Sequence, residues 1–141
     1  MKTVHILLVE DNEGDIVLTL DAFEESKIIT DISVVKNGQD ALDFLFKRGK
    51  FKDEKKPDLI LLDINLPIFN GHDVLKVIKE SDELKKTPVI ILTTSSNQKD
   101  INQAYENHSN SFVTKPIDMD DFLKAIVKIE EFWLQLTKFP D

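Results

Sequence analysis

The chain contains no cysteine in its 141 residues. This absence excludes disulfide bonds, a thiolate nucleophile and any cysteine-ligated zinc or iron–sulfur centre. Long hydrophobic runs are missing too, since no apolar stretch approaches the roughly 20 residues that a membrane-spanning helix needs. The apolar stretch near the N-terminus is too short for a secretory signal peptide, and it ends on acidic residues. We therefore expect a cytoplasmic protein without a membrane partner.

Positive charge is also scarce, because 18 Lys and Arg residues stand against 26 Asp and Glu residues, for a formal net charge of −8. Nucleic-acid binding needs clustered positive charge that displaces counterions, so we expect no nucleic-acid partner. An acidic protein is better suited to a cationic partner or a metal ion. The chain carries no repeat, low-complexity segment or linker, so one domain with a single core is expected.

The stretch from Pro57 to Gly71 organises the rest of the chain. Its apolar run, residues 59–62, is typical of a strand buried on both faces, and it ends abruptly on Asp63. Turn-forming residues follow, namely Pro67, Asn70 and Gly71. Asp63 is therefore predicted at the C-terminal tip of a central strand, where open parallel sheets bind their ligands. On this stretch alone, an acid that merely faces solvent fits equally well.

The hydrophobic periodicity predicts five strands that alternate with five helices. The strands are expected over residues 3–9, 31–35, 59–62, 89–92 and 111–114, and the helices over 13–26, 41–49, 71–82, 98–107 and 118–136. Such alternation indicates an α/β fold with a doubly wound, five-stranded parallel sheet and helices on both faces. The first, third and fourth strands are the most apolar, which favours the strand order 2-1-3-4-5.

Polar side chains stand at the ends of four predicted strands: Glu10 and Asp11 at the first, Asp63 at the third, Thr93 at the fourth and Lys115 at the fifth. Each has a plain surface explanation. In a parallel sheet, however, all these ends lie along one edge, so the coincidence favours a common site. The fold would gather three carboxylates, a hydroxyl and an ammonium in one crevice.

The chemistry of this set points to phosphoryl transfer. Crowded carboxylates need a cation, and an all-oxygen ligand set favours Mg²⁺ or Mn²⁺. The compact charge of Lys115 suits a phosphate group, and Thr93 can donate its hydroxyl to a phosphoryl oxygen. An aspartate can attack phosphorus and form an aspartyl phosphate, in a reaction that depends mostly on positioning and charge neutralisation. The residues therefore fit metal-dependent phosphorylation of Asp63.

The motifs that carry these residues resemble the response-regulator receiver domain of two-component signalling. They are Val9-Glu10-Asp11, Leu62-Asp63-Ile64-Asn65-Leu66-Pro67 with Asn70-Gly71, Thr93-Thr94, and Phe112-Val113-Thr114-Lys115-Pro116. The resemblance covers essentially the whole chain. It implies a flavodoxin-like three-layer sandwich and a single receiver domain over residues 1–141, without an output domain.

The resemblance implies a role for each matching residue. Asp63 would be the phosphoacceptor, and the metal would bind the side chains of Glu10, Asp11 and Asp63 and the backbone carbonyl of Asn65. Lys115 would bind the phosphoryl group. The protein would catalyse only its own phosphorylation and dephosphorylation, as a phosphoprotein of a phosphorelay, with a sensor histidine kinase as phosphodonor.

Three further segments resemble the small regulators paired with bacterial phytochromes: Glu10 to Asp15, Thr93 to Ser96, and Ile129 to Leu134. A phytochrome kinase is the partner that this likeness implies. Two positions depart from the commonest receiver pattern, because Glu10 stands where Asp is frequent and Thr94 where Ala is frequent. Thr94 is expected to slow access to the phosphoryl group.

The signal is expected to leave by contact with a downstream protein. We expect Thr93 and Phe112 to form a coupled switch pair, in which phosphorylation draws Thr93 toward the phosphoryl group and Phe112 turns inward into the vacated space. The surface of the last two helices and the last strand would then change. The final helix carries a second apolar stripe, which predicts a homodimer or partner face with Phe132, Trp133 and Leu136. Alternatively, the tail 132–139 folds back on the core.

Three other functions compete with this interpretation. A phosphatase or mutase also uses an Asp nucleophile, but such enzymes commonly show a second Asp where Asn65 stands here. A flavin carrier would need a Ser-, Thr- and Gly-rich loop where this chain has acids, and a degenerate receiver would signal without phosphate. His5, His72 and His108 are expected to be surface or strand residues rather than ligands.

Overall fold

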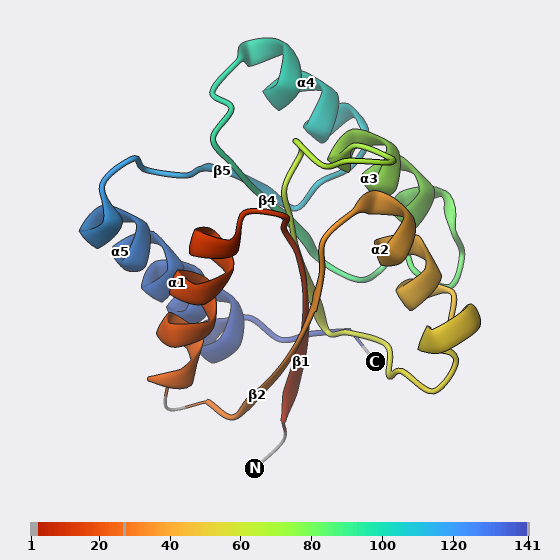
Figure 1. The fold of residues 1–141 in the computed structure, drawn as a ribbon, viewed down its shortest axis with the longest axis horizontal. Helices are drawn as coiled ribbons and strands as arrows, with labels where there is room; N and C mark the ends of the chain where they lie inside the picture. The colour runs from red at the N-terminus through yellow and green to blue at the C-terminus, as the bar shows by residue number, and fades with distance from the viewer. Residues whose placement is uncertain (1–2, 27, 141) are drawn as a thin grey trace.

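The computed structural model describes residues 3–26 and 28–140, with the side chain of Leu136 left outside the description (Figure 1). Within these residues the chain forms one five-stranded parallel sheet with the order β2-β1-β3-β4-β5. The strands are β1 (Val4–Val9), β2 (Thr30–Val35), β3 (Leu59–Leu62), β4 (Val89–Thr93) and β5 (Ser111–Thr114). The fold class and the strand order predicted from the sequence are confirmed.

In the part of the chain that the structure describes, five α-helices cover the two faces of the sheet. They are α1 (Glu13–Glu24), α2 (Gly38–Leu45), α3 (Gly71–Glu80), α4 (Gln98–Glu106) and α5 (Met119–Glu130). Helices α1 and α5 lie side by side on one face, and α2, α3 and α4 lie on the other (Figure 1). The result is a three-layer sandwich in which each face of the sheet has its own apolar cluster.

Strand β3 lies at the centre of both clusters. All four of its residues are fully buried, with Leu59 and Leu61 facing the cluster under α1 and α5, and Ile60 and Leu62 facing the other. Removing such a side chain from water contributes about 1.5–3 kcal/mol. The edge strands β2 and β5 are only partly buried, which explains their more polar sequences.

Every α-helix begins with a side-chain cap at the same edge of the sheet. An Asn or Asp side chain accepts a hydrogen bond from a backbone N–H in the first turn in each case, at Asn12, Asn37, Asn70, Asn97 and Asp118. Such a cap stabilises a helix by about 1 kcal/mol. The prediction of a cap at Asp118 is confirmed.

Helix α2 ends earlier than predicted. Its last residue is Leu45, because Lys47 takes a left-handed conformation with φ of 57° and breaks the helix. A short 3₁₀ turn, Gly49–Phe51, follows, and the Phe51 ring packs against Phe44 with centroids 5.6 Å apart. In the charged segment 50–56, Phe51 is half-buried, while Lys50 and residues 52–56 are exposed.

The last helix reaches Leu136 as predicted, but its final part, Glu131–Leu136, has π-helical geometry. Leu134 is buried there, Trp133 is half-buried, and Phe132 stays 54% exposed. Leu134, Trp133 and Phe139 contact the cluster under α1 and α5, so part of the tail completes the core of this chain. Of the three predicted partner-face side chains, only Phe132 is largely exposed, and the Leu136 side chain lies outside the described residues.

Candidate functional site

Three carboxylates meet at the edge where the strands end. Oxygen atoms of Glu10, Asp11 and Asp63 lie within 4.8 Å of one another. Glu10 follows β1 and is buried, Asp63 follows β3 and is buried, and Asp11 is exposed. Because the two strands are neighbours in register, with Val9 beside Leu62, their next residues must emerge side by side. This set of hard oxygen donors fits a divalent cation such as Mg²⁺ or Mn²⁺.

Lys115 connects the carboxylates. It follows β5, its side chain is 3% exposed, and its ammonium donates to Glu10, to Asp15 at 2.9 Å and to Asp63 at 3.2 Å. The Asp15 contact was not predicted from the sequence. Its only signal was a further acid in the segment Glu10 to Asp15, in what becomes the first turn of α1. The site therefore holds four carboxylates, and three of them contact the Lys115 ammonium.

Burial and charge shift two pKa values in this site. Burial raises the pKa of Glu10 to about 7, and the charge of Asp63 adds to the effect, although the bond from Lys115 opposes it. Burial alone would lower the pKa of Lys115, but its bonds to Glu10 and Asp15 and the charges of Asp63 and Glu10 raise it above its ordinary value. A fixed ammonium thus coexists with a carboxylate that is costly to ionise, and an added cation would relieve that cost.

The turn after Asp63 is fixed by its backbone. The Asp63 side chain accepts from the Asn65 N–H at 3.2 Å, and the Gly71 N–H donates to the Ile64 carbonyl at 2.7 Å. A Cβ atom at Gly71 would lie 2.2 Å from the Asp63 carbonyl oxygen, so only glycine allows this approach. Asn65 itself is exposed, and it lines a cavity of about 650 Å³ together with Asp11.

Thr93 and Phe112 lie on neighbouring strands. Thr93 is fully buried at the end of β4, and Phe112 is half-buried on β5 opposite Ile91, two residues before Thr93 in register. The Thr93 hydroxyl oxygen is 3.5 Å from the Ser95 N–H, at the outer limit of a hydrogen bond. The structure therefore places the predicted switch pair on adjacent strands, with Thr93 nearer the carboxylates' edge.

The histidines differ from expectation at one position. His5 lies on β1 and contacts Asp31 at 3.3 Å, and His108 is exposed, as a strand residue and a surface residue should be. His72 was expected to be a surface or strand residue, and this prediction is wrong. It is a buried helix residue, at the start of α3, and its Nε2 atom lies 3.0 Å from Asp100.

No helix within residues 3–26 and 28–140 combines the length and the apolar character that crossing a lipid bilayer requires.

Comparisons with known proteins agree with this geometry. The response regulator receiver domain model matches residues 6–127. Response regulator Rcp1 of Synechocystis sp. is 39% identical over 135 residues, which cover 96% of this chain and 92% of Rcp1. The similarity therefore extends over almost the full length of both chains.

Two solved structures are also similar over almost the whole chain. The phosphorylated cyanobacterial phytochrome response regulator RcpA has a TM-score of 0.97 at 38% identity, covering 99% of this chain and 100% of RcpA. The Mn²⁺-bound form of Rcp1 has a TM-score of 0.96 at 38% identity, covering 98% of this chain and 99% of that one. With this match of sequence and fold, the chain belongs to the response regulator receiver domain family.

Proposed function

We propose that this receiver domain accepts a phosphoryl group on Asp63 and passes the signal on by protein contact. The observation that carries the proposal is the position of Asp63, a buried carboxylate at the end of the central strand with the Lys115 ammonium 3.2 Å away. The family assignment supports it, as does the likeness to a response regulator described as phosphorylated. It also leaves the phosphatase, mutase and flavin-carrier alternatives without support.

In the proposed reaction, a carboxylate oxygen of Asp63 forms a bond to phosphorus. The bond between phosphorus and the donor breaks, and the leaving group takes the electron pair. The Lys115 ammonium lies beside Asp63 and can form an ion pair with the phosphoryl oxygens after transfer. The Thr93 hydroxyl can donate a hydrogen bond to one of these oxygens. The protein would act on itself only.

Glu10, Asp11 and Asp63, with the backbone carbonyl of Asn65, would hold a divalent cation. The donor set fits, because three carboxylate oxygens lie within 4.8 Å of one another and burial makes the ionised form of Glu10 costly even with Lys115 beside it. When bound, Mg²⁺ or Mn²⁺ supplies positive charge to the phosphoryl oxygens and the leaving group. The Mn²⁺-bound form of the related Rcp1 supports this proposal.

The proposed donor is a sensor histidine kinase, since the chain is a receiver domain, and the likeness to RcpA and Rcp1 favours a phytochrome kinase. Thr93 and Phe112 would then change together and alter the α4–β5–α5 face. Large apolar side chains are already exposed on or next to this face, at Tyr105, Val127 and Phe132. A cytoplasmic location stays a prediction from the sequence.

The same face would form a homodimer, with Phe132, Trp133 and Leu136 as its candidate residues. Sedimentation velocity, with and without phosphorylation, measures this directly. We expect a dimer for the wild type and a monomer for Phe132→Asp, because an exposed aromatic side chain would be replaced by a charge. Monomers under both conditions for the wild type would remove the dimer.

Intact-mass measurement after treatment with acetyl phosphate and Mg²⁺ tests the central proposal. The wild type should gain the mass of one phosphoryl group, and Asp63→Asn should gain none. Treatment without Mg²⁺ should give little product, because the carboxylates would lack their cation. A wild type that gains no mass would leave the degenerate receiver as the better interpretation.

A further inference from the structure

A chain of hydrogen bonds runs from the β4–α4 loop to helix α3 through three side chains. The Ser95 hydroxyl donates to Asp100 at 2.6 Å, and the other oxygen of Asp100 lies 3.0 Å from Nε2 of His72. A carboxylate only accepts, so Nε2 of His72 must carry the hydrogen. We call these three residues the Ser95–Asp100–His72 relay. The pKa of Asp100 is lowered by the bonds from Ser95 and His72, which keeps the central carboxylate ionised.

Each end of the relay is attached to the phosphoacceptor site. Ser95 stands two residues after Thr93, and its N–H faces the Thr93 hydroxyl oxygen at 3.5 Å. The Ser95 carbonyl also accepts from the Thr114 hydroxyl at 3.3 Å, which joins the loop to the end of β5. His72 follows Gly71, whose backbone is held against Asp63. The relay therefore spans from the Thr93 side of the site to the Asp63 side.

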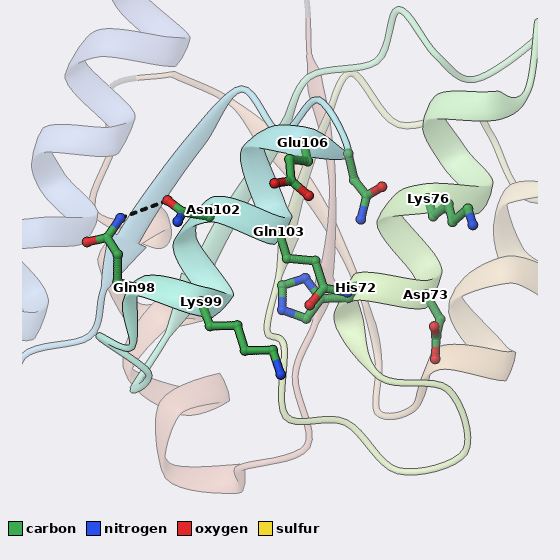
Figure 2. A pocket seen from close by; sticks show the side chains of 9 residues that line it. His72, Asp73, Lys76, Gln98, Lys99, Asn102, Gln103 and Glu106 are labelled. Carbon is green, nitrogen blue, oxygen red and sulfur yellow. Dashed lines mark hydrogen bonds between the residues drawn. The ribbon is translucent and has the colours of Figure 1, made fainter.

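His72 lies in a position that packing alone does not explain. Its side chain is 6% exposed, and Figure 2 shows it between α3 and α4, in a groove of about 710 Å³. The other ring nitrogen, Nδ1, is buried without a hydrogen-bond partner among the described residues. A half-satisfied imidazole is costly in such a place, where an apolar side chain would pack without that cost. The bond to Asp100 is what the imidazole contributes there.

The contact between His72 and Asp100 also has no counterpart between α3 and α4 in the described part of the fold. Among those residues, the pair of His72 and Asp100 is the one hydrogen bond or ion pair that joins α3 to α4. The other groove side chains are polar and mostly exposed, and they include Lys76, Lys99 and Gln103 (Figure 2). Movement of the β4–α4 loop can thus reach α3 directly through this contact.

We propose that Ser95, Asp100 and His72 are positioning residues that hold the Thr93 loop against α3 and oppose the movement of Thr93 toward the phosphoryl group. The inference rests on the proposed function, in which Thr93 moves toward the phosphoryl group. That movement displaces Ser95, which must stretch a short bond between a hydroxyl and a carboxylate. Bonds of this kind are stronger than bonds between neutral groups, so the relay sets part of the cost of the change. Breaking it lowers that cost and loosens α4 from α3.

The test compares Ser95→Ala with Ser96→Ala, an adjacent and exposed serine with no described hydrogen bond, and with Ser95→Thr, which keeps a hydroxyl. We expect Ser95→Ala to be phosphorylated by acetyl phosphate about three- to tenfold faster than wild type. Ser96→Ala should match wild type, and Ser95→Thr should restore most of the wild-type rate. Asp100→Ala, at a partly exposed helical position, provides a second break with little risk to folding.

Backbone amide shifts of the unphosphorylated proteins provide a readout that a merely structural role would not move. In Ser95→Ala and Asp100→Ala, the shifts around Thr93 and Phe112 should move along the line that joins unphosphorylated and phosphorylated wild type. Variants with the rate and shifts of Ser96→Ala would overturn the relay, as would slower phosphorylation. A wild type that gains no phosphoryl mass would instead refute the proposed function, and the relay's role would fall with it.

Discussion

Two lysines at opposite edges of the sheet show how one residue type serves two purposes. Lys115, at the carboxyl ends of the strands, contacts three carboxylates, and its pKa is raised. Lys79, at the far end of α3, donates to the carbonyls of Lys85 and Thr87 and to the Asn110 side chain, and burial lowers its pKa. The neutral acceptors around Lys79 only fix the neighbouring loops. The carboxylates around Lys115 can in addition bind a cation, and the ammonium beside them can bind an anion.

The largest expected effect comes from exchanging each lysine for methionine. Lys115→Met should lower the rate of phosphorylation by acetyl phosphate about a hundredfold or more, because the charge beside the reacting oxygens is lost. Lys79→Met should stay within about twofold of wild type, although it loses three hydrogen bonds and about 1–2 kcal/mol of stability. A mass-resolved time course measures both rates. Equal rates in the two variants would remove the distinction between the edges.

Two glycines extend the comparison to the backbone. Gly71→Ala would place a Cβ atom 2.2 Å from the Asp63 carbonyl oxygen and 2.6 Å from Ile64 Cα, atoms that cannot rotate away. We expect a loss of about 2–3 kcal/mol in the free energy of unfolding. At Gly49, which follows the C-terminal end of α2, an added Cβ atom would have no neighbour within 4 Å. Gly49→Ala should therefore cost only the strain of the left-handed conformation, about 1 kcal/mol of the free energy of unfolding. Urea unfolding measures both, and a larger loss at Gly49 would contradict the close contact.

Added Mg²⁺ should act at one edge only. At a concentration ten times its dissociation constant, the cation should stabilise the folded wild type by about 1.4 kcal/mol. Asp11→Asn should weaken this response, because Asp11 belongs to the three-carboxylate cluster. Asp31→Asn, which alters an acid beside His5, is the matched control and should respond like wild type. Thermal unfolding with and without Mg²⁺ reads both, and a full response in Asp11→Asn would exclude that ligand.

The smallest effect is the alkaline behaviour of Lys79. Its pKa in the folded protein lies below the ordinary 10.5, so between the two values the unfolded chain binds more protons than the folded one. The free energy of unfolding of the wild type should therefore rise, relative to Lys79→Met, as the pH increases through that window. Denaturant midpoints of the two proteins at about pH 8 and about pH 10.5 give the difference. An opposite slope would mean that the ammonium is better stabilised in the folded state than in water.

The features that depend on the strands, namely their order and the residues at their carboxyl ends, could be predicted from the sequence. The apolar run of β3 and the polar residue after each strand could be interpreted because parallel strands bring their ends to one edge, whatever the side chains do elsewhere. The strand order followed from the same apolar runs, since the most buried strands must be central. Asp63 and Lys115 are 52 residues apart in the chain, and topology alone brings them into contact.

Contacts between helices could not be predicted in the same way. Asp15, His72 and Asp100 are polar residues in first helical turns, where such residues are common at the surface, and their neighbours depend on how the helices pack. The close approach of Gly71 to Asp63 is likewise a matter of tertiary distance rather than of turn propensity. The π-helical end of the chain changes which side chains share a face, which a regular helical periodicity does not anticipate.

The capped N-termini of the helices add a positive electrostatic potential at the edge of the sheet where the acidic side chains lie. Five helices, each with its peptide dipoles aligned, direct their electropositive N-terminal ends toward the rim that holds the acids. This field originates in the main chain, so no single substitution can remove it. A protein with a negative net charge can therefore still provide a locally favourable electrostatic potential for an incoming anion at this one rim.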